Sequence, residues 1–156
     1  QYIMQGIATP DGFRSVAEAG PATGRSGMYV TSEWAEAVQY MGGIPPVPQW
    51  LPSGWNISKF SIGLADNVST LTISYVHPDV TSILTYTYYA FFDSNLYMVV
   101  EQDAAGTYEV LKDGTKVYLT TNLGNRTATW YTDHAEYMIS GELTKEELLR
   151  MATEIK

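Results

Sequence analysis

Two histidines and the aspartates beside them are the side chains with which this chain could do acid–base or metal chemistry. His77 lies in the segment VHPDV with Asp79, and His134 lies in TDHAE with Asp133. An imidazole near a carboxylate can transfer protons or bind a metal ion. Both segments are typical of turns, however, and no H-x-x-x-H or H-E-x-x-H spacing is present. We therefore expect solvated turn histidines, with no metal ion and no catalytic residue.

The other carboxylates and the lack of cysteine also point away from an enzyme. Aspartates in the predicted turns lack the D-x-D-x-D-G spacing of a calcium loop. The chain has no cysteine, no G-x-S-x-G motif, no phosphate loop and no G-x-G-x-x-G motif. We expect neither a cofactor nor catalysis. Four glutamates fall at the start and on the outer side of a predicted helix, where capping and solubility explain them: Glu142, Glu146, Glu147 and Glu154.

Aromatic side chains are the one residue class in excess. The chain has 4 Trp, 12 Tyr and 4 Phe, and the segment YTYYAFF is the densest patch. Aromatic rings favour strands, and tyrosine can bury its ring while its hydroxyl stays in water. Two interpretations stay open: a tyrosine-rich core, or a face that binds a glycan, a peptide or a lipid-like ligand. The candidate ligand-binding residues are Tyr86, Tyr88, Tyr89, Phe91 and Trp130.

Most of the chain after residue 56 alternates between apolar and polar side chains with period two, the pattern of half-buried strands. Turn residues separate the runs, so we predict a twisted antiparallel meander of about six to eight strands. If Tyr86 and Tyr88 fill a helix-covered core, alternation places Tyr89 and Phe91 on the opposite face. The predicted strands are KFSIGL, STLTISYV, SILTYTYYAFF, NLYMVVEQ, TYEVL, KVYLTT, RTATWYT and AEYMISG.

A helix with a well-marked start follows the last strand. Thr144 and Glu147 predict a capping box, and Leu143 and Leu148 predict a hydrophobic staple. A helix this short is marginal alone in water, so we expect it to pack on the apolar face of the sheet. Leu148, Ala152 and Ile155 are the predicted inner stripe, with Leu149 and Met151 beside it, and Glu146 and Arg150 are a predicted ion pair.

The N-terminal third predicts helix and a proline-rich connector. TSEWAEAVQYMGG reads as a helix that Thr31 or Ser32 caps and Gly42 ends, and a shorter helix is predicted over 13–19. The segment IPPVPQWLPSGW is too rich in proline for regular structure, yet too apolar for a free tether. We predict a single α+β domain over 1–156, in which residues 1–49 pack across an edge or the second face of the sheet formed by 50–156.

Charge and hydropathy exclude several partners. The formal net charge of -8 disfavours nucleic acid and anionic membrane surfaces. No stretch of the sequence approaches the roughly 18 apolar residues of a membrane span. The chain begins with QYIMQ and has no leader of basic then apolar residues. We expect an upstream segment, such as a signal peptide or anchor, to have been removed.

The C-terminal segment WYTDHAEYMISGELTKEELLRMA combines a Trp-bearing strand, a Tyr-x-Ile-x-Gly strand end and a Leu-Thr-x-Glu-Glu-Leu helix with a later Ala. In this motif the chain resembles a known bacterial family, domain of unknown function 4367. The resemblance covers about 50–156 and includes WLPSGW, YMVVEQ and LKDGTKVYL. It implies the extracytoplasmic end of a membrane-anchored, lipoprotein-like envelope protein, and in some members a link to anti-sigma or sensing systems. It implies no activity and no catalytic residues. The positions that carry it are Trp130, Tyr137, Ile139, Gly141, Leu143, Thr144, Glu146, Glu147, Leu148 and Ala152.

These observations leave three hypotheses for function. The first is a non-catalytic extracytoplasmic sensory or interaction domain, regulatory in the manner of an anti-sigma protein, whose partner is an envelope protein or peptide. The second is a carrier of a lipid-like or other hydrophobic small molecule between a curved sheet and its helix, which requires a cavity of several hundred Å³. The third is glycan binding through exposed aromatic rings.

Overall fold

The computed structural model describes residues 3–4, 7–8, 26–92 and 107–156 of the chain. Two predicted elements lie outside these ranges, the short helix over 13–19 and the strand NLYMVVEQ over 95–102. The described residues include one eight-stranded sheet and two helices that pack with it.

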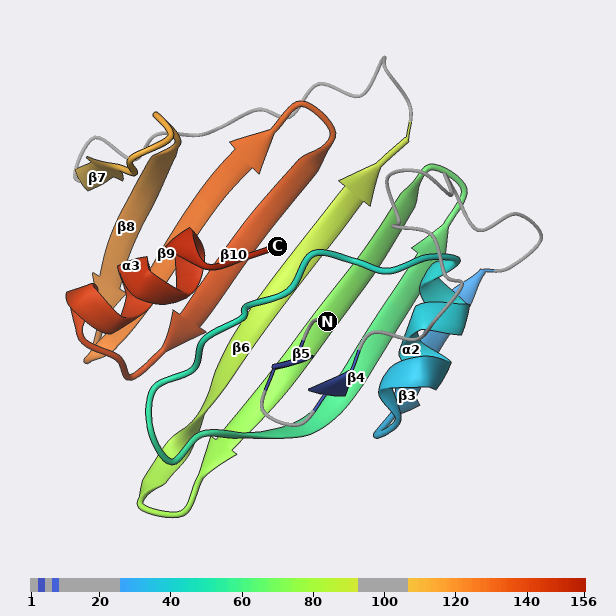
Figure 1. Cartoon of the computed structure of the whole chain (residues 1–156), viewed down its shortest axis with the longest axis horizontal. Helices are drawn as coiled ribbons and strands as arrows, with labels where there is room; N and C mark the ends of the chain where they lie inside the picture. Colours follow the sequence, from blue (N-terminus) through green and yellow to red (C-terminus); the bar gives the residue numbers. More distant parts are fainter. Residues whose placement is uncertain (1–2, 5–6, 9–25, 93–106) are drawn as a thin grey trace.

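Eight strands form one antiparallel sheet, in the order β3-β4-β5-β6-β10-β9-β8-β7 (Figure 1). Among the described residues, two helices accompany it, α2 (Trp34–Met41) and α3 (Lys145–Thr153), and β1 (Ile3–Met4) pairs separately with β2 (Ile7–Ala8). The predicted α+β class is confirmed. The strands of the sheet are β3 (Gly27–Thr31), β4 (Asn56–Ala65), β5 (Val68–His77), β6 (Val80–Phe91), β7 (Thr107–Val110), β8 (Lys116–Asn122), β9 (Asn125–Thr132) and β10 (Ala135–Gly141).

The sheet consists of two meanders that meet in its middle. Strands β3 to β6 follow one another across one half, and β7 to β10 return from the far edge, so that β10 pairs with β6. The central register places Ile139 opposite Tyr86 and Tyr137 opposite Tyr88. The edge strand β3, which the sequence pattern did not predict, pairs Val30 with Ser61 of β4.

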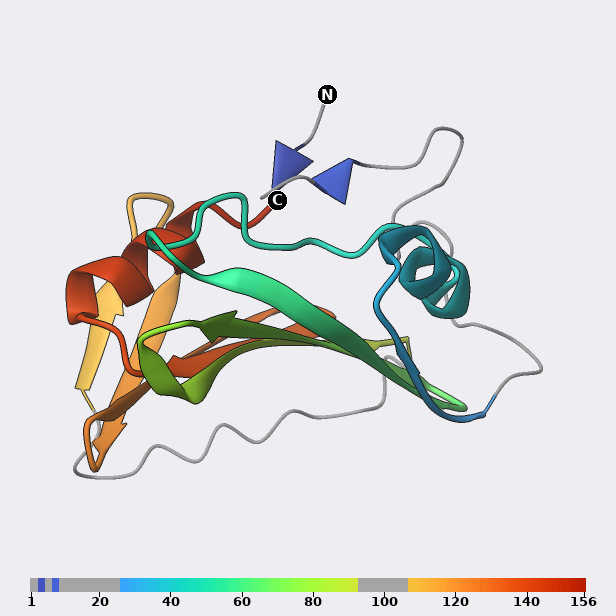
Figure 2. The same ribbon diagram turned by 90° about the horizontal axis from the view of Figure 1, so that it is seen from below.

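Both helices and the connector lie on the same face of the sheet (Figure 2). We call this the helix-bearing face, and the opposite one, on which none of the described helices packs, the open face. On the helix-bearing face Phe60, Ile73, Tyr86 and Ile139 are almost fully buried. Of the two predicted positions for the N-terminal segment, an edge or the second face, α2 takes the first: it packs over the β3–β4 edge on the helix-bearing face, with the rings of Trp34 and Phe60 5.5 Å apart between centroids.

The width of the sheet explains why α3 does not cover this face alone. Eight strands spaced at about 4.8 Å make a sheet roughly 34 Å wide, whereas the nine residues of α3 span only about 14 Å. Helix α3 therefore covers the β8–β10 half, α2 covers the β3–β4 edge, and the connector crosses the strands between them (Figure 1).

The capping box of α3 is formed as predicted. The Thr144 hydroxyl accepts from the backbone N–H of Glu147 at 3.2 Å, and the Thr144 N–H donates to the Glu147 carboxylate at 3.0 Å. Leu143 and Leu148, the two residues of the staple, are both buried. These contacts satisfy backbone donors that the first turn of a helix otherwise leaves open.

Two other expectations for α3 are corrected. Arg150 does not pair with Glu146; its Nε lies 3.2 Å from Glu154 Oε2, and its guanidinium stacks 4.2 Å from the centroid of the Trp50 ring. The face of the Trp50 ring attracts the guanidinium of Arg150 toward the connector. Rules for residue spacing within a helix do not predict this contact, because Trp50 lies in another segment. Met151 belongs to the buried stripe, while Ile155 lies beyond the helix and is only half-buried.

The connector and the C-terminal tail hold each other against the sheet. Pro48 and Ile155 form an antiparallel bridge. Backbone hydrogen bonds flank it, with Val47 donating to Lys156 at 3.1 Å and Gln49 donating to Glu154 at 2.8 Å. The side chain of Val47 is fully buried and anchors this part of the connector in the core. The prolines thus exclude a regular helix without preventing this short, strand-like contact.

Helix α2 ends as predicted but starts later. Gly42 adopts φ 76°, a left-handed conformation that favours glycine, and closes the helix. The N-cap is Glu33, whose side chain makes no capping hydrogen bond, and neither Thr31 nor Ser32 occupies that position. Thr31 ends strand β3 instead, and its hydroxyl accepts from the Glu33 N–H at 3.0 Å.

Candidate ligand-binding site

The five candidate residues divide between the two faces of the sheet. Tyr86, Tyr88 and Trp130 are buried on the helix-bearing face. Tyr89 and Phe91 alternate with them along β6, so they stand on the open face, where both are half-buried. A single site that uses all five side chains is therefore excluded by the geometry of the strand.

Tyr86 belongs to the core. Its side chain is fully buried, and its hydroxyl donates a 2.6 Å hydrogen bond to the Pro46 carbonyl of the connector. Because the connector covers it, Tyr86 is not accessible to a ligand. The bond instead supplies the partner that a buried tyrosine hydroxyl requires.

Tyr88, Tyr137 and Trp130 form a continuous row of rings across β6, β10 and β9, which we call the aromatic row. Cross-strand register places Tyr137 between the other two. Its ring stacks on Trp130 with centroids 5.2 Å apart and planes at 3°, and meets Tyr88 at 5.3 Å and 48°. Such contacts stabilise aromatic pairs beyond the area they bury, so the row is a rigid surface.

Two hollows adjoin the aromatic row, and Tyr137 lines both. The first has a volume of about 400 Å³ and is bordered by Tyr88, Ala90 and Ala135. Ala90 and Ala135 are opposite each other in the register, so two methyl groups stand where neighbouring positions carry rings. This difference in side-chain size makes the depression. Its volume falls within the roughly 300–1,000 Å³ typical of small-molecule sites.

The second hollow lies between the aromatic row, the β7–β8 turn and the end of α3. Its volume is about 280 Å³, and Trp130, Leu111 and Ala152 contribute to its walls. A larger depression of about 710 Å³ lies beside α2, but Glu33, Glu36 and Gln39 line it next to Tyr29 and Tyr40. We take the two hollows on the aromatic row as the candidate site, because aromatic rings and alanine side chains line both. Polar groups also border them, Asp133 and His134 at the first and Lys112 and Asp113 at the second.

The aromatic row is electrically neutral at ordinary pH. Burial raises the pKa of the Tyr88 hydroxyl, and the neighbouring Tyr137 raises it further. Burial also raises the pKa of Tyr137, although a hydrogen bond with Thr132 opposes this. Both hydroxyls therefore stay protonated, and they can donate a hydrogen bond to a ligand. The surroundings favour an apolar group with few polar atoms.

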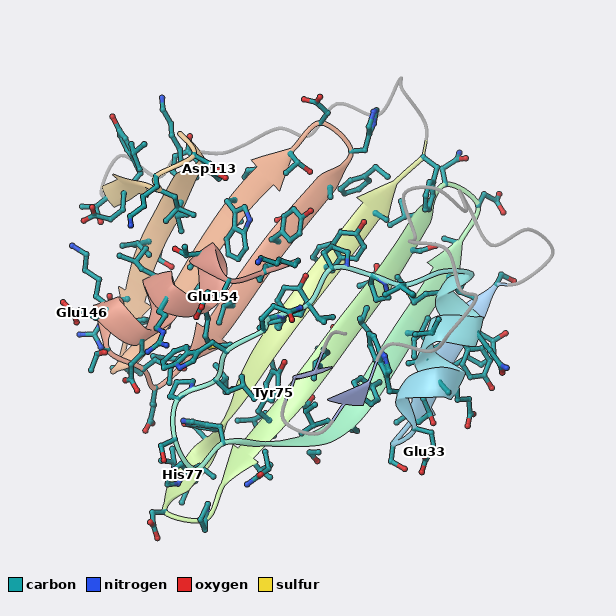
Figure 3. All side chains as sticks on the ribbon, viewed as in Figure 1. Glu33, Tyr75, His77, Asp113, Glu146 and Glu154 are labelled. Carbon is teal, nitrogen blue, oxygen red and sulfur yellow. The ribbon has the colours of Figure 1, made fainter. Side chains whose placement is uncertain are left out.

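The histidines do not meet at this site. His77 ends β5 opposite Val80, packs its ring 5.3 Å from Trp55, and accepts at Nδ1 from the Asp79 N–H at 3.0 Å (Figure 3). The His134 carbonyl accepts from the N–H of Phe91, at the other end of β6. The two ends of this 12-residue strand are roughly 36 Å apart.

Carboxylates show no convergent arrangement within the described residues. No group of three or more His, Cys, Asp or Glu side chains is placed to hold a metal ion there. Glu146 lies in the first turn of α3 and Glu154 at its end (Figure 3); Glu146 is exposed and Glu154 is half-buried. Glu147 completes the capping box and Glu154 pairs with Arg150, so both have structural roles.

A sequence profile of a known family matches residues 45–155. The chain belongs to the family described as domain of unknown function DUF4367. The DUF4367 region starts in the connector and ends in the C-terminal tail, the two segments that bridge at Pro48 and Ile155. It contains the whole aromatic row and excludes β3 and α2. The family resemblance expected over about 50–156 is confirmed.

No curated protein and no solved structure matches the chain. None of the described helices is long and apolar enough to cross a membrane. The family description assigns no ligand to this domain.

Tyr137 is the site residue that sequence reasoning missed. It was noted as part of the C-terminal motif, and its alternation with Ala135 and Ile139 already indicated an inward-facing side chain. Its place between Tyr88 and Trp130 depends on the pairing of β10 with both β6 and β9. No local pattern in the sequence specifies that pairing.

Proposed function

We propose that this protein is a non-catalytic binding domain in the extracytoplasmic part of a membrane-anchored bacterial protein, and that a hydrophobic ligand lies on its aromatic row. One observation carries the binding proposal: Tyr88 and Tyr137 of the aromatic row line a hollow of about 400 Å³, and Tyr137 and Trp130 line a second one of about 280 Å³. Family resemblance supports the location. Ligand binding there is the means by which such a domain would sense its surroundings.

The chemistry of the hollow favours an alkyl chain or an aromatic ring. Each buried methylene contributes about 0.8 kcal/mol, so a chain of about eight carbons gains roughly 6 kcal/mol on entry. Association costs offset a large part of this gain. We expect dissociation constants in the micromolar to millimolar range for simple probes, which requires an equilibrium titration rather than capture on a resin.

The binding test uses the uncharged fluorophore N-phenyl-1-naphthylamine, whose emission rises in apolar surroundings. Ala135→Leu fills the hollow while it leaves all three rings in place, and Ala35→Leu adds the same atoms at an exposed position of α2. We expect wild type and Ala35→Leu to bind alike, and Ala135→Leu to bind at least tenfold more weakly with an unchanged circular dichroism spectrum. Equal binding by all three proteins would refute the site.

A competition series then defines the ligand class. Straight-chain alcohols of increasing length should displace the fluorophore with rising affinity until the hollow is full. The affinity of a polar competitor such as a trisaccharide should not depend on Ala135. If the trisaccharide displaced the fluorophore and the alcohols did not, glycan binding would replace the hydrophobic-ligand proposal.

The location has its own test. We expect a tag placed at residue 156 of the full-length protein to be cleaved by protease added to spheroplasts or protoplasts, whose cytoplasmic membrane is intact. A tag that is protected until the cells are lysed would contradict the extracytoplasmic placement.

A second candidate function, binding of an envelope protein or peptide, is favoured by the β3 edge. Met28 and Val30 of this edge strand are 75% and 65% exposed, and β3 has no neighbour on its outer side among the described strands. An extended peptide could add a strand there. Val30→Lys should abolish capture of such a partner, because charge on an edge strand opposes pairing; capture that persists would exclude this edge.

A further inference from the structure

A glutamate between two tyrosines stands on the open face, opposite the aromatic row. The register pairs Glu136 of β10 with Tyr89 of β6 and with Tyr131 of β9. The three side chains therefore stand side by side in one line across the strands, which we call the Tyr–Glu–Tyr row. All three are half-buried.

The Glu136 carboxylate has little to balance its charge. The Tyr131 hydroxyl donates to Glu136 Oε1 at 3.5 Å, a long hydrogen bond. The ion pairs among the described residues join Lys145 to Glu109 and Arg150 to Glu154, so neither involves Glu136. A carboxylate that is partly removed from water without a cation is unfavourable, and a cation would relieve that cost.

The nearest arrangement of a cation and a ring on this face belongs to β7 and β8. Lys116 holds its ammonium 5.3 Å from the centroid of the Tyr108 ring. This pair shows the kind of contact that tyrosines of the open face make with an ammonium group. The Tyr–Glu–Tyr row has the same ring chemistry and adds a carboxylate.

The spacing of the strands suits a cation above Glu136. Neighbouring strands lie about 4.8 Å apart, so β6 and β9 hold their tyrosines roughly 9.6 Å from each other with β10 between them. A cation centred over β10 is then about 4.8 Å from each ring, inside the ~6 Å at which an aromatic face attracts it. Glu136 stands on β10 between the two tyrosines, so its carboxylate is within reach of a cation placed there.

We propose that the Tyr–Glu–Tyr row, Tyr89, Glu136 and Tyr131, binds an alkylammonium group. Burial raises the pKa of Glu136, and the negative charge of Glu136 adds to the effect of burial in raising the pKa of both tyrosines. Raised pKa values at all three groups are expected when a carboxylate interacts with two neighbouring tyrosines and with no cation among the described residues. The site is separate from the aromatic row, because it uses the other face of the same strands.

The test is a titration followed by backbone ¹H–¹⁵N NMR at constant ionic strength, with tetramethylammonium chloride and butylammonium chloride as probes and sodium chloride as reference. We expect saturable shifts that centre on residues 89, 131 and 136 with either organic cation and not with sodium. Tighter binding of tetramethylammonium would indicate a methylated ammonium ligand, and tighter binding of butylammonium a primary amine such as lysine.

Matched variants separate the site from general attraction to an acidic protein. Glu136→Gln and Glu142→Gln both remove one negative charge, and Glu142 is exposed in the loop before α3. We expect Glu136→Gln to weaken binding at least fivefold, Glu142→Gln to leave it unchanged, and Tyr131→Leu to weaken tetramethylammonium more than butylammonium. Equal loss in the two glutamine variants, or shifts that centre elsewhere, would overturn the proposal.

Discussion

Replacement of Leu148 by alanine tests whether apolar burial holds α3 on the sheet. Leu148 is fully buried at the fourth position of the helix, and Leu143, the other residue of the predicted staple, is buried too. Helix α3 packs mainly on β9, so its inner stripe is continuous with the core around Ala128 and Trp130. Leu149, the next residue, is only half-buried and provides the control. Replacing leucine by alanine changes the helix propensity by the same amount at positions 148 and 149.

The expected magnitude follows from burial. Truncation of a fully buried leucine removes its transfer free energy and leaves a cavity, which together cost about 2–5 kcal/mol of unfolding free energy. Leu149→Ala removes the same atoms from a half-exposed position, so we expect it to cost about 1 kcal/mol. For a chain of this length each kcal/mol lowers the midpoint by about 2–4 °C, so Leu148→Ala should melt roughly 4–20 °C below wild type.

Urea unfolding followed by circular dichroism measures both effects. A lower midpoint with an unchanged denaturant slope in Leu148→Ala reports lost stability of the same folded state. The reasoning is refuted if Leu148→Ala costs no more than Leu149→Ala, because α3 would then not be held by its inner stripe. A smaller slope in both variants would also contradict it, since the helix would already be detached.

Three further changes have defined outcomes. Thr144→Ala should lower the unfolding free energy by about 1 kcal/mol, and Thr144→Ser should not, because serine keeps the capping oxygen; equal melting of all three proteins would mean that the cap contributes nothing. Gly141→Ala would place a Cβ 2.8 Å from Leu84 Cδ1 and 3.2 Å from Leu84 Cα, so we expect a cost of about 1–3 kcal/mol, and an unshifted melt would contradict the close packing. Glu136 faces Tyr89 and Tyr131 and has a folded-state pKa above its usual value; the folded protein then binds its proton more tightly, and wild-type stability should rise relative to Glu136→Gln as pH falls from 7 through that pKa. A stability difference between these two proteins that stays constant from pH 7 to pH 4 would exclude such a shift.

Much of the fold could be predicted because its signals are local. Alternation along β6 separates Tyr86 and Tyr88 from Tyr89 and Phe91, and the structure places the two pairs on opposite faces. The capping box uses residues three positions apart, and it forms as the sequence predicts. Of the five predicted residues, Tyr88, Phe91 and Trp130 line the two hollows, Tyr86 is core, and Tyr89 stands on the open face. Tyr137, which lines both hollows, is not among the predicted residues.

The contacts at the two ends of the chain have a common physical origin. Arg150 chooses Glu154 and the Trp50 ring over Glu146, since the connector is brought beside α3 only in the folded protein. The N-terminal helix lies on the helix-bearing face because α3 is too short to cover eight strands. Glu146 and Glu154 are both four residues from Arg150, so local spacing allows either pair; the Trp50 contact and the position of α2 depend on the tertiary structure.

By itself, the sequence determined which side of the predicted strands faces the core and where α3 begins, because both depend on neighbours within a few positions. Only the tertiary structure decided that β10 pairs with β6 and in which register. That pairing places Tyr137 between Tyr88 and Trp130 on one face and Glu136 between two tyrosines on the other. This register pairs residues about fifty positions apart in the sequence. Backbone hydrogen bonds do not distinguish one side chain from another, so the register is selected by side-chain packing over the whole sheet.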